Sequence, residues 1–226
     1  MLGANAGRPG CACSWRRQFP LREGAEVHED MHRRSLLGRA LIAGLGGALL
    51  SSPLAIAASA SEASDLASAL RSGTFILYFR HAATREGGND RPFTPRAEQR
   101  NLSEYGISQS RLIGARLRAL RIPLGEVLSS PFYRCTDMAD LAFGRHRIEP
   151  NLISLANTGR PSGRADWLRR RLSTPPPPGG NLVLIAHVHN FQRVARLTLR
   201  EGEAAIVQPM REAGFRVLAR RMPEAW

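Results

Sequence analysis

The chain has 226 residues, of which 43% are hydrophobic, so it can form one folded domain with an additional segment. Its formal net charge is +13 at pH 7, and all 32 basic residues are arginine because the sequence contains no lysine. The arginines are spread along the whole chain and aromatic residues make up only 6%, which argues against a nucleic-acid partner, although a cationic chain still favours anionic ligands such as phosphate groups.

Residues 31–57 have the order of parts of a secretory signal. Arg33 and Arg34 precede an uncharged apolar run at residues 40–50, and small-x-small cleavage patterns follow it. The run is shorter than the roughly 20 residues that span a bilayer as a helix. We therefore expect a cleaved signal peptide, a periplasmic or secreted protein, and no stable membrane span after cleavage. An uncleaved anchor or a buried core helix is the alternative, and the Sec and twin-arginine routes both remain open.

Residues 1–30 show no hydrophobic periodicity, and we expect them to be a disordered or wrongly assigned extension, with translation starting at Met31. Cys11 and Cys13 lie in this stretch. Cys135 is then the lone cysteine of the remaining chain, residues 58–226, so neither an intramolecular disulfide nor a cysteine zinc site is expected there.

In residues 58–226, short apolar runs typical of buried strands alternate with helical patterns. Strands are predicted at residues 74–80, from 127, at 181–186, 204–208 and 215–219, and helices at 102–121, 132–143, 164–172 and 191–200. This order predicts a single α/β domain with a mainly parallel sheet and helices on both faces. Ligands bind such sheets at the carboxyl ends of the strands.

Three predicted strands end in residues that carry chemistry: His81, the turn of residues 129–134, and His187. Taken singly, a histidine after a strand is usually a packing residue, and Arg134 is typical of a solvated surface group. If they converge, they form a cationic site with titratable nitrogens. A phosphoryl group needs this combination, because fixed positive charge binds its oxygens and a neutral imidazole can attack its phosphorus.

Four segments carry recognisable motifs in order: RHAAT at residues 80–84, RNLSEYGISQ at 100–109, SSPFYR at 129–134 and LIAH at 184–187. Together they resemble the motifs of the histidine phosphatase superfamily, also called phosphoglycerate mutase-like. The resemblance implies a phosphatase that acts on phosphomonoesters or on a phosphohistidine-like group, without a metal or another cofactor. Its partner would be a small phosphorylated substrate or a phosphorylated component of the cell envelope.

The resemblance also implies a role for each matching residue. His81 is the nucleophile that becomes a phosphohistidine. Arg80 and Arg134 clamp the phosphoryl oxygens with charge-assisted hydrogen bonds. His187 donates a further hydrogen bond, and Thr84 adds a hydroxyl contact.

The sequence departs from the family pattern at two points. Ala82 stands where the family usually has glycine, which restricts the backbone. The proton donor to the leaving group is also missing from its usual places, because Val188 follows the second histidine and residues 152–157 contain no carboxylate. We name Glu203 as the candidate donor, with Asp137 as the alternative, although Asp137 could simply pair with an arginine.

Three other interpretations remain open. His187 and His189 have a spacing found in metal sites, but no third ligand is indicated. A phosphomutase would need long loops that close over its intermediate. A non-catalytic envelope module that binds phosphorylated ligands is the third possibility.

Overall fold

The computed structural model describes residues 64–156 and 163–226, which fall in a single compact unit. The predicted extension and signal peptide, residues 1–30 and 31–57, lie outside the described residues. Among the residues that are described, no helix has the length and apolar character needed to cross a membrane.

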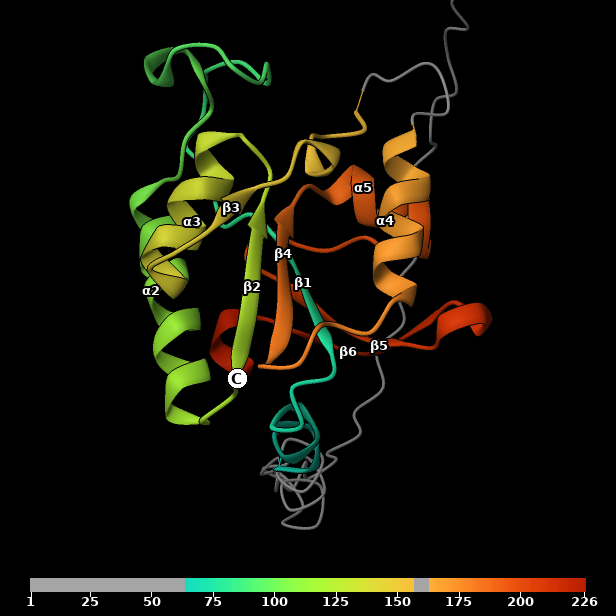
Figure 1. The fold of residues 1–226 in the computed structure, drawn as a ribbon. Coiled ribbons are helices and arrows are strands. Elements are labelled where there is room, and N and C mark those ends of the chain that lie inside the picture. The colour runs from blue at the N-terminus through green and yellow to red at the C-terminus, as the bar shows by residue number, and fades with distance from the viewer. Residues whose placement is uncertain (1–63, 157–162) are drawn as a thin grey trace, which may run out of the picture. The chain divides into compact units, whose positions relative to one another are not determined.

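One six-stranded sheet forms the centre of the fold, in the order β3-β2-β4-β1-β5-β6 (Figure 1). The four adjacent strands β3, β2, β4 and β1 are parallel to one another, whereas β5 runs antiparallel to β1 and β6 antiparallel to β5. The prediction of a mainly parallel sheet is therefore confirmed. The strands are β1 (Ile76–Arg80), β2 (Leu124–Ser129), β3 (Arg147–Ile148), β4 (Asn181–Ala186), β5 (Ala204–Pro209) and β6 (Phe215–Arg221).

Helices cover both faces of the sheet, as predicted (Figure 1). The helices α2 (Glu104–Ala119) and α3 (Tyr133–Phe143) share one hydrophobic cluster with Leu77 and Phe79 of β1. The helices α4 (Gly163–Ser173) and α5 (Val188–Ala195) share the other cluster with Ile76 and Tyr78. Successive side chains of β1 thus alternate between the two cores, and this is why the strand reads as a continuous apolar run.

The helix predicted at residues 191–200 was placed wrongly. The helix α5 begins directly after His187 and ends at Ala195, where Arg196 adopts a left-handed conformation with φ of 59°. Arginine carries no sequence signal for this conformation, which glycine usually adopts at a helix end. The prediction also missed β3, which has only two residues, and a helical segment at residues 64–70.

Candidate active site

The carboxyl ends of three adjacent strands bring the candidate residues together. His81 follows β1, Ser130 follows β2 and His187 follows β4, which lies between the other two strands. The backbone hydrogen bonds between the strands continue past the strand ends. His81 N donates to Ala186 O at 3.0 Å, and Ser130 N donates to Ile185 O at 2.9 Å. The sheet itself therefore fixes the relative positions of these three residues.

The His81 ring is buried, with 2% of the residue exposed, and its tautomer follows from its contacts. Its Nδ1 lies 2.9 Å from Ala82 O. A carbonyl oxygen only accepts, so Nδ1 carries the hydrogen and Nε2 keeps its lone pair. Burial, and then the nearby Arg134, hold the pKa of His81 well below its ordinary value. His81 is thus neutral at pH 7 and has an unprotonated Nε2.

The His187 ring faces that of His81 edge-on, with 5.5 Å between the ring centroids. Its Nδ1 lies 3.3 Å from Nη2 of Arg134, which can only donate, and its Nε2 lies 2.9 Å from Oγ of Ser130. The hydrogen of the neutral ring is therefore on Nε2. Burial first, then His81 and Arg134, lower the pKa of His187 well below its ordinary value.

Arg134 is the largest fully buried side chain of the site, with 2% of the residue exposed. Its guanidinium carbon lies 4.2 Å from the centroid of the Phe132 ring, and Nη1 forms an ion pair with Oδ1 of Asp90 at 3.0 Å. Its Nε is buried without a hydrogen-bond partner. A buried cation with an unsatisfied donor favours an anion beside it.

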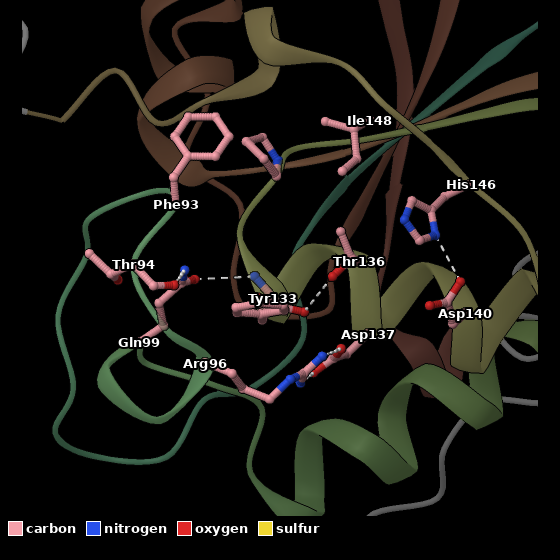
Figure 2. A pocket seen from close by; sticks show the side chains of 11 residues that line it. Phe93, Thr94, Arg96, Gln99, Tyr133, Thr136, Asp137, Asp140, His146 and Ile148 are labelled. Carbon is pink, nitrogen blue, oxygen red and sulfur yellow. Dashed lines mark hydrogen bonds and ion pairs between the residues drawn. The ribbon is translucent and has the colours of Figure 1, made fainter.

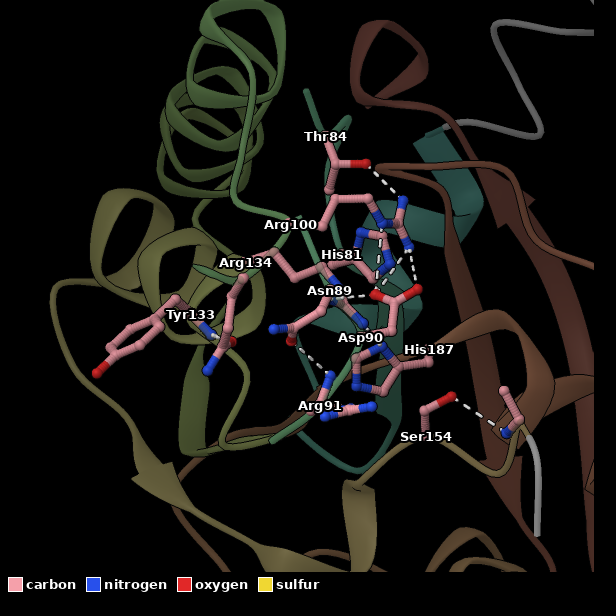
Figure 3. Close-up of polar contacts among 12 residues, drawn as sticks. His81, Thr84, Asn89, Asp90, Arg91, Arg100, Tyr133, Arg134, Ser154 and His187 are labelled. Atoms are coloured by element: carbon pink, nitrogen blue, oxygen red, sulfur yellow. Dashed lines mark hydrogen bonds and ion pairs between the residues drawn. The ribbon is translucent and has the colours of Figure 1, made fainter. Parts of the chain in front are cut away.

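A second guanidinium, that of Arg100, completes the site (Figure 3). Arg100 donates from Nη1 to Oγ1 of Thr84 at 2.7 Å, and its Nη2 lies 3.3 Å from Oδ1 of Asp90. Its charge also lowers the pKa of both site histidines. We call the set His81, Thr84, Arg100, Arg134 and His187 the anion cup.

Arg80 lies at the edge of the anion cup and is held by the loop before β5. Its Nη1 donates to Leu199 O at 2.9 Å, and its Nη2 donates to Oε1 of Glu201 at 3.2 Å. Oε1 of Glu201 also accepts from Thr84 at 3.3 Å. Nε of Arg80 is buried without a partner. Arg80 thus joins the site, but two of its three nitrogens already have protein acceptors.

The two carboxylates named as proton donors lie elsewhere. Glu203 is buried, but its Oε2 accepts from Arg200 N at 2.7 Å and its Oε1 lies 3.6 Å from Nε of Arg220. Asp137 forms a bidentate pair with Arg96 at 2.6 and 2.9 Å, on the wall of a separate pocket of about 350 Å³ (Figure 2). In the contacts that the structure describes, neither carboxylate reaches the site histidines.

The segment after His81 is fixed by the start of α2. Ser103 N donates to Ala83 O at 3.0 Å, and Ala83 N donates to Oε1 of Gln109 at 3.0 Å. A Cβ on Gly106 would lie only 2.0 Å from Ala83 O, so glycine permits this close approach. The residues of the RNLSEYGISQ motif therefore position the backbone that follows His81.

Ala82 fits this arrangement without strain. It is fully buried in the cluster shared with α2 and α3, and it is absent from the described residues with positive φ. The Ala82 methyl group therefore packs in the core and requires no unusual backbone conformation.

Three charged residues of the site, Asp90, Arg100 and Glu201, were not predicted from the sequence. Arg100 had a signal, because it is the first residue of the RNLSEYGISQ motif. Asp90 and Glu201 lie in loops, where no periodicity marks a residue.

Among residues 64–156 and 163–226, no group of three or more histidine, cysteine, aspartate or glutamate side chains could hold a metal ion.

Neither a protein-family model nor a curated protein matches this chain. Solved structures that it resembles include the putative phosphohistidine phosphatase SixA from Agrobacterium tumefaciens, with 16% identity, a TM-score of 0.47 and coverage of 67% of this chain and 99% of that one. A phosphoserine phosphatase from Entamoeba histolytica has 11% identity, a TM-score of 0.48 and coverage of 67% and 98%. A putative alpha-ribazole-5'-P phosphatase from Escherichia coli has 14% identity, a TM-score of 0.48 and coverage of 66% and 98%. These likenesses are remote, so we base the functional proposal on the chain's own side chains.

Proposed function

We propose that this chain is a phosphatase of the histidine phosphatase type, with His81 as the phosphoryl acceptor. One observation carries the proposal: a neutral, buried imidazole with a free Nε2 lies beside a buried guanidinium whose Nε has no partner. This pair supports the proposal because phosphoryl transfer to a histidine needs a neutral imidazole as nucleophile and a positive charge for the phosphoryl oxygens.

In the proposed reaction, the Nε2 lone pair of His81 attacks phosphorus and the bond to the leaving oxygen breaks. Arg134 and Arg100 stabilise the charge on the transferred oxygens, and the hydroxyl of Thr84 positions Arg100 by accepting its hydrogen bond. Water then attacks the phosphohistidine, the P–N bond breaks, and its electron pair returns to Nε2. Positioning and positive charge are the main requirements of this transfer, so the guanidiniums can act without a metal.

The hydrogen bonds of His187 support a role in positioning. Its Nδ1 accepts from Arg134 and its Nε2 donates to Ser130, so the ring links the guanidinium to the end of β2. When an anion binds to Arg134, protonation of His187 becomes more favourable, and the ring can then donate to a phosphoryl oxygen.

The cell envelope is the proposed location, and a small phosphorylated molecule or a phosphorylated envelope component is the proposed substrate. The signal-like pattern of residues 31–57 supports the location. Removing residues 1–57 leaves 25 arginines and 15 acidic residues (32 − 7 and 19 − 4), and this positive balance favours anionic substrates.

Hydrolysis of 4-nitrophenyl phosphate by the purified full chain tests the proposal. We expect turnover that vanadate inhibits and EDTA leaves unchanged. His81→Ala should abolish it, whereas His189→Ala, at an exposed histidine outside the cup, should retain it. Phosphate binding without turnover would instead indicate a binding module, and a strict requirement for zinc would refute the metal-independent mechanism.

A further inference from the structure

The carboxylate of Asp90 lies at the open side of the anion cup. Its Oδ1 is 3.0 Å from Nη1 of Arg134 and 3.3 Å from Nη2 of Arg100, the two guanidiniums assigned to the phosphoryl oxygens (Figure 3). The Asp90 side chain is 53% exposed, whereas His81 and Arg134 are buried. Asp90 therefore lies between the buried nucleophile region and solvent.

The backbone that carries Asp90 is held in place. Asn89 N donates to Glu98 O at 2.7 Å, and Arg100 N donates to Asn89 O at 3.1 Å. Gly88 has φ of +78°, and a Cβ there would lie 2.6 Å from the carbonyl carbon of Gln99. The loop is thus held against the segment before α2 by backbone hydrogen bonds.

We propose that Asp90 is the proton donor to the leaving oxygen, an inference that rests on the proposed function. An in-line displacement places the leaving oxygen opposite the attacking atom. Because His81 attacks from the buried side, the leaving oxygen faces the exposed side, where Asp90 lies.

Substrate binding also changes the charges that act on Asp90. The charged groups that face its carboxylate are Arg134 and Arg100, and Arg100 also approaches Glu201 at 3.7 Å. A bound phosphate contacts these guanidiniums in place of the Asp90 carboxylate and adds negative charge beside it.

The protons balance over one turnover. The carboxyl group of Asp90 gives its proton to the leaving oxygen as the P–O bond breaks and the P–N bond to His81 forms. The resulting carboxylate takes a proton from the water molecule that attacks the phosphohistidine. The net reaction is phosphomonoester plus water to alcohol plus phosphate, with Asp90 protonated again before the next transfer.

The test compares wild-type protein with Asp90→Asn on aryl phosphates of graded leaving-group ability, from 4-nitrophenyl phosphate to 4-methoxyphenyl phosphate. A good leaving group departs without a proton, whereas a poor one needs it. We expect the loss of kcat/KM in the variant to grow along the series, to about 100-fold for the poorest leaving group. Asp90→Glu should restore part of that loss, because it keeps the acid. Asp140→Asn, at a carboxylate paired with His146, is the matched control and should show no such trend.

An equal loss of kcat/KM on every substrate would overturn the assignment. An Asp90→Asn variant that is faster and binds phosphate more tightly would also overturn it, because Asp90 would then only compete with phosphate for the anion cup. Failure of the proposed function looks different: the wild-type protein would hydrolyse none of the aryl phosphates. Circular dichroism shows whether each variant folds. If Asp90→Asn does not fold, the comparison of Asp90→Glu with the wild-type protein tests the assignment.

Discussion

The two buried histidines predict a steep loss of stability in mild acid. Both have pKa values well below the ordinary value of about 6.5 when the protein is folded, whereas the unfolded chain binds protons at that value. Stability from such groups is complete above the unfolded pKa and falls as the pH drops below it. Between pH 7.5 and 5.5 the expected loss is about 1.4 kcal/mol for each histidine, or about 2.7 kcal/mol for both.

Urea unfolding at the two pH values measures this loss in the wild-type protein and in the double variant His81→Gln/His187→Gln. The free energy of unfolding should fall by about 2.7 kcal/mol more in the wild-type protein, because the carboxylate contributions are common to both. His189→Gln removes an exposed histidine and should leave the wild-type dependence unchanged. An equal pH dependence in the wild-type protein and the double variant would mean that the site histidines bind protons equally well in the folded and the unfolded protein, which contradicts their lowered pKa values.

Other predictions concern the cup and its supports. Arg134→Lys keeps the charge but removes the planar fork, so kcat/KM should fall by about 100-fold in the aryl phosphate assay; an unchanged value would contradict the clamp. Gly106→Ala would place its Cβ 2.0 Å from Ala83 O, and we expect a loss of about 1–3 kcal/mol in urea unfolding together with lower kcat, whereas Ser108→Ala on the exposed face of α2 should do neither. Burial raises the pKa of Cys135 to about 12, so iodoacetamide at pH 8 should alkylate it, as read by peptide mass spectrometry, only after unfolding.

The sequence predicts the parts of the fold that depend on apolar runs. The strand β4 has the bounds predicted for it, because all of its residues are buried and all except Asn181 are apolar. Ser103 is the helix N-cap that the sequence indicates, and its Oγ accepts from Gly106 N. The antiparallel direction of β5 could not be predicted, since alternating strands and helices indicate only that strands and helices pack together.

The candidate site was predictable where residues follow strands. His81 and His187 lie at the ends of β1 and β4, and sheet geometry brings such positions together. Asp90 reaches the cup from a loop whose course depends on the contacts of Asn89 with residues 98–100. Long-range loop contacts leave no periodic trace in a sequence, so the sequence does not indicate that Asp90 lies beside Arg134 and Arg100.

The central claim is that His81 carries the phosphoryl group during turnover. Rapid quenching of the full chain with a phosphoryl-labelled substrate under alkaline conditions, followed by peptide mapping, tests it directly. We predict label on His81 that is stable in alkali, is lost in acid, and is absent from His81→Ala. Turnover without any labelled peptide, or label on another residue, would contradict the mechanism.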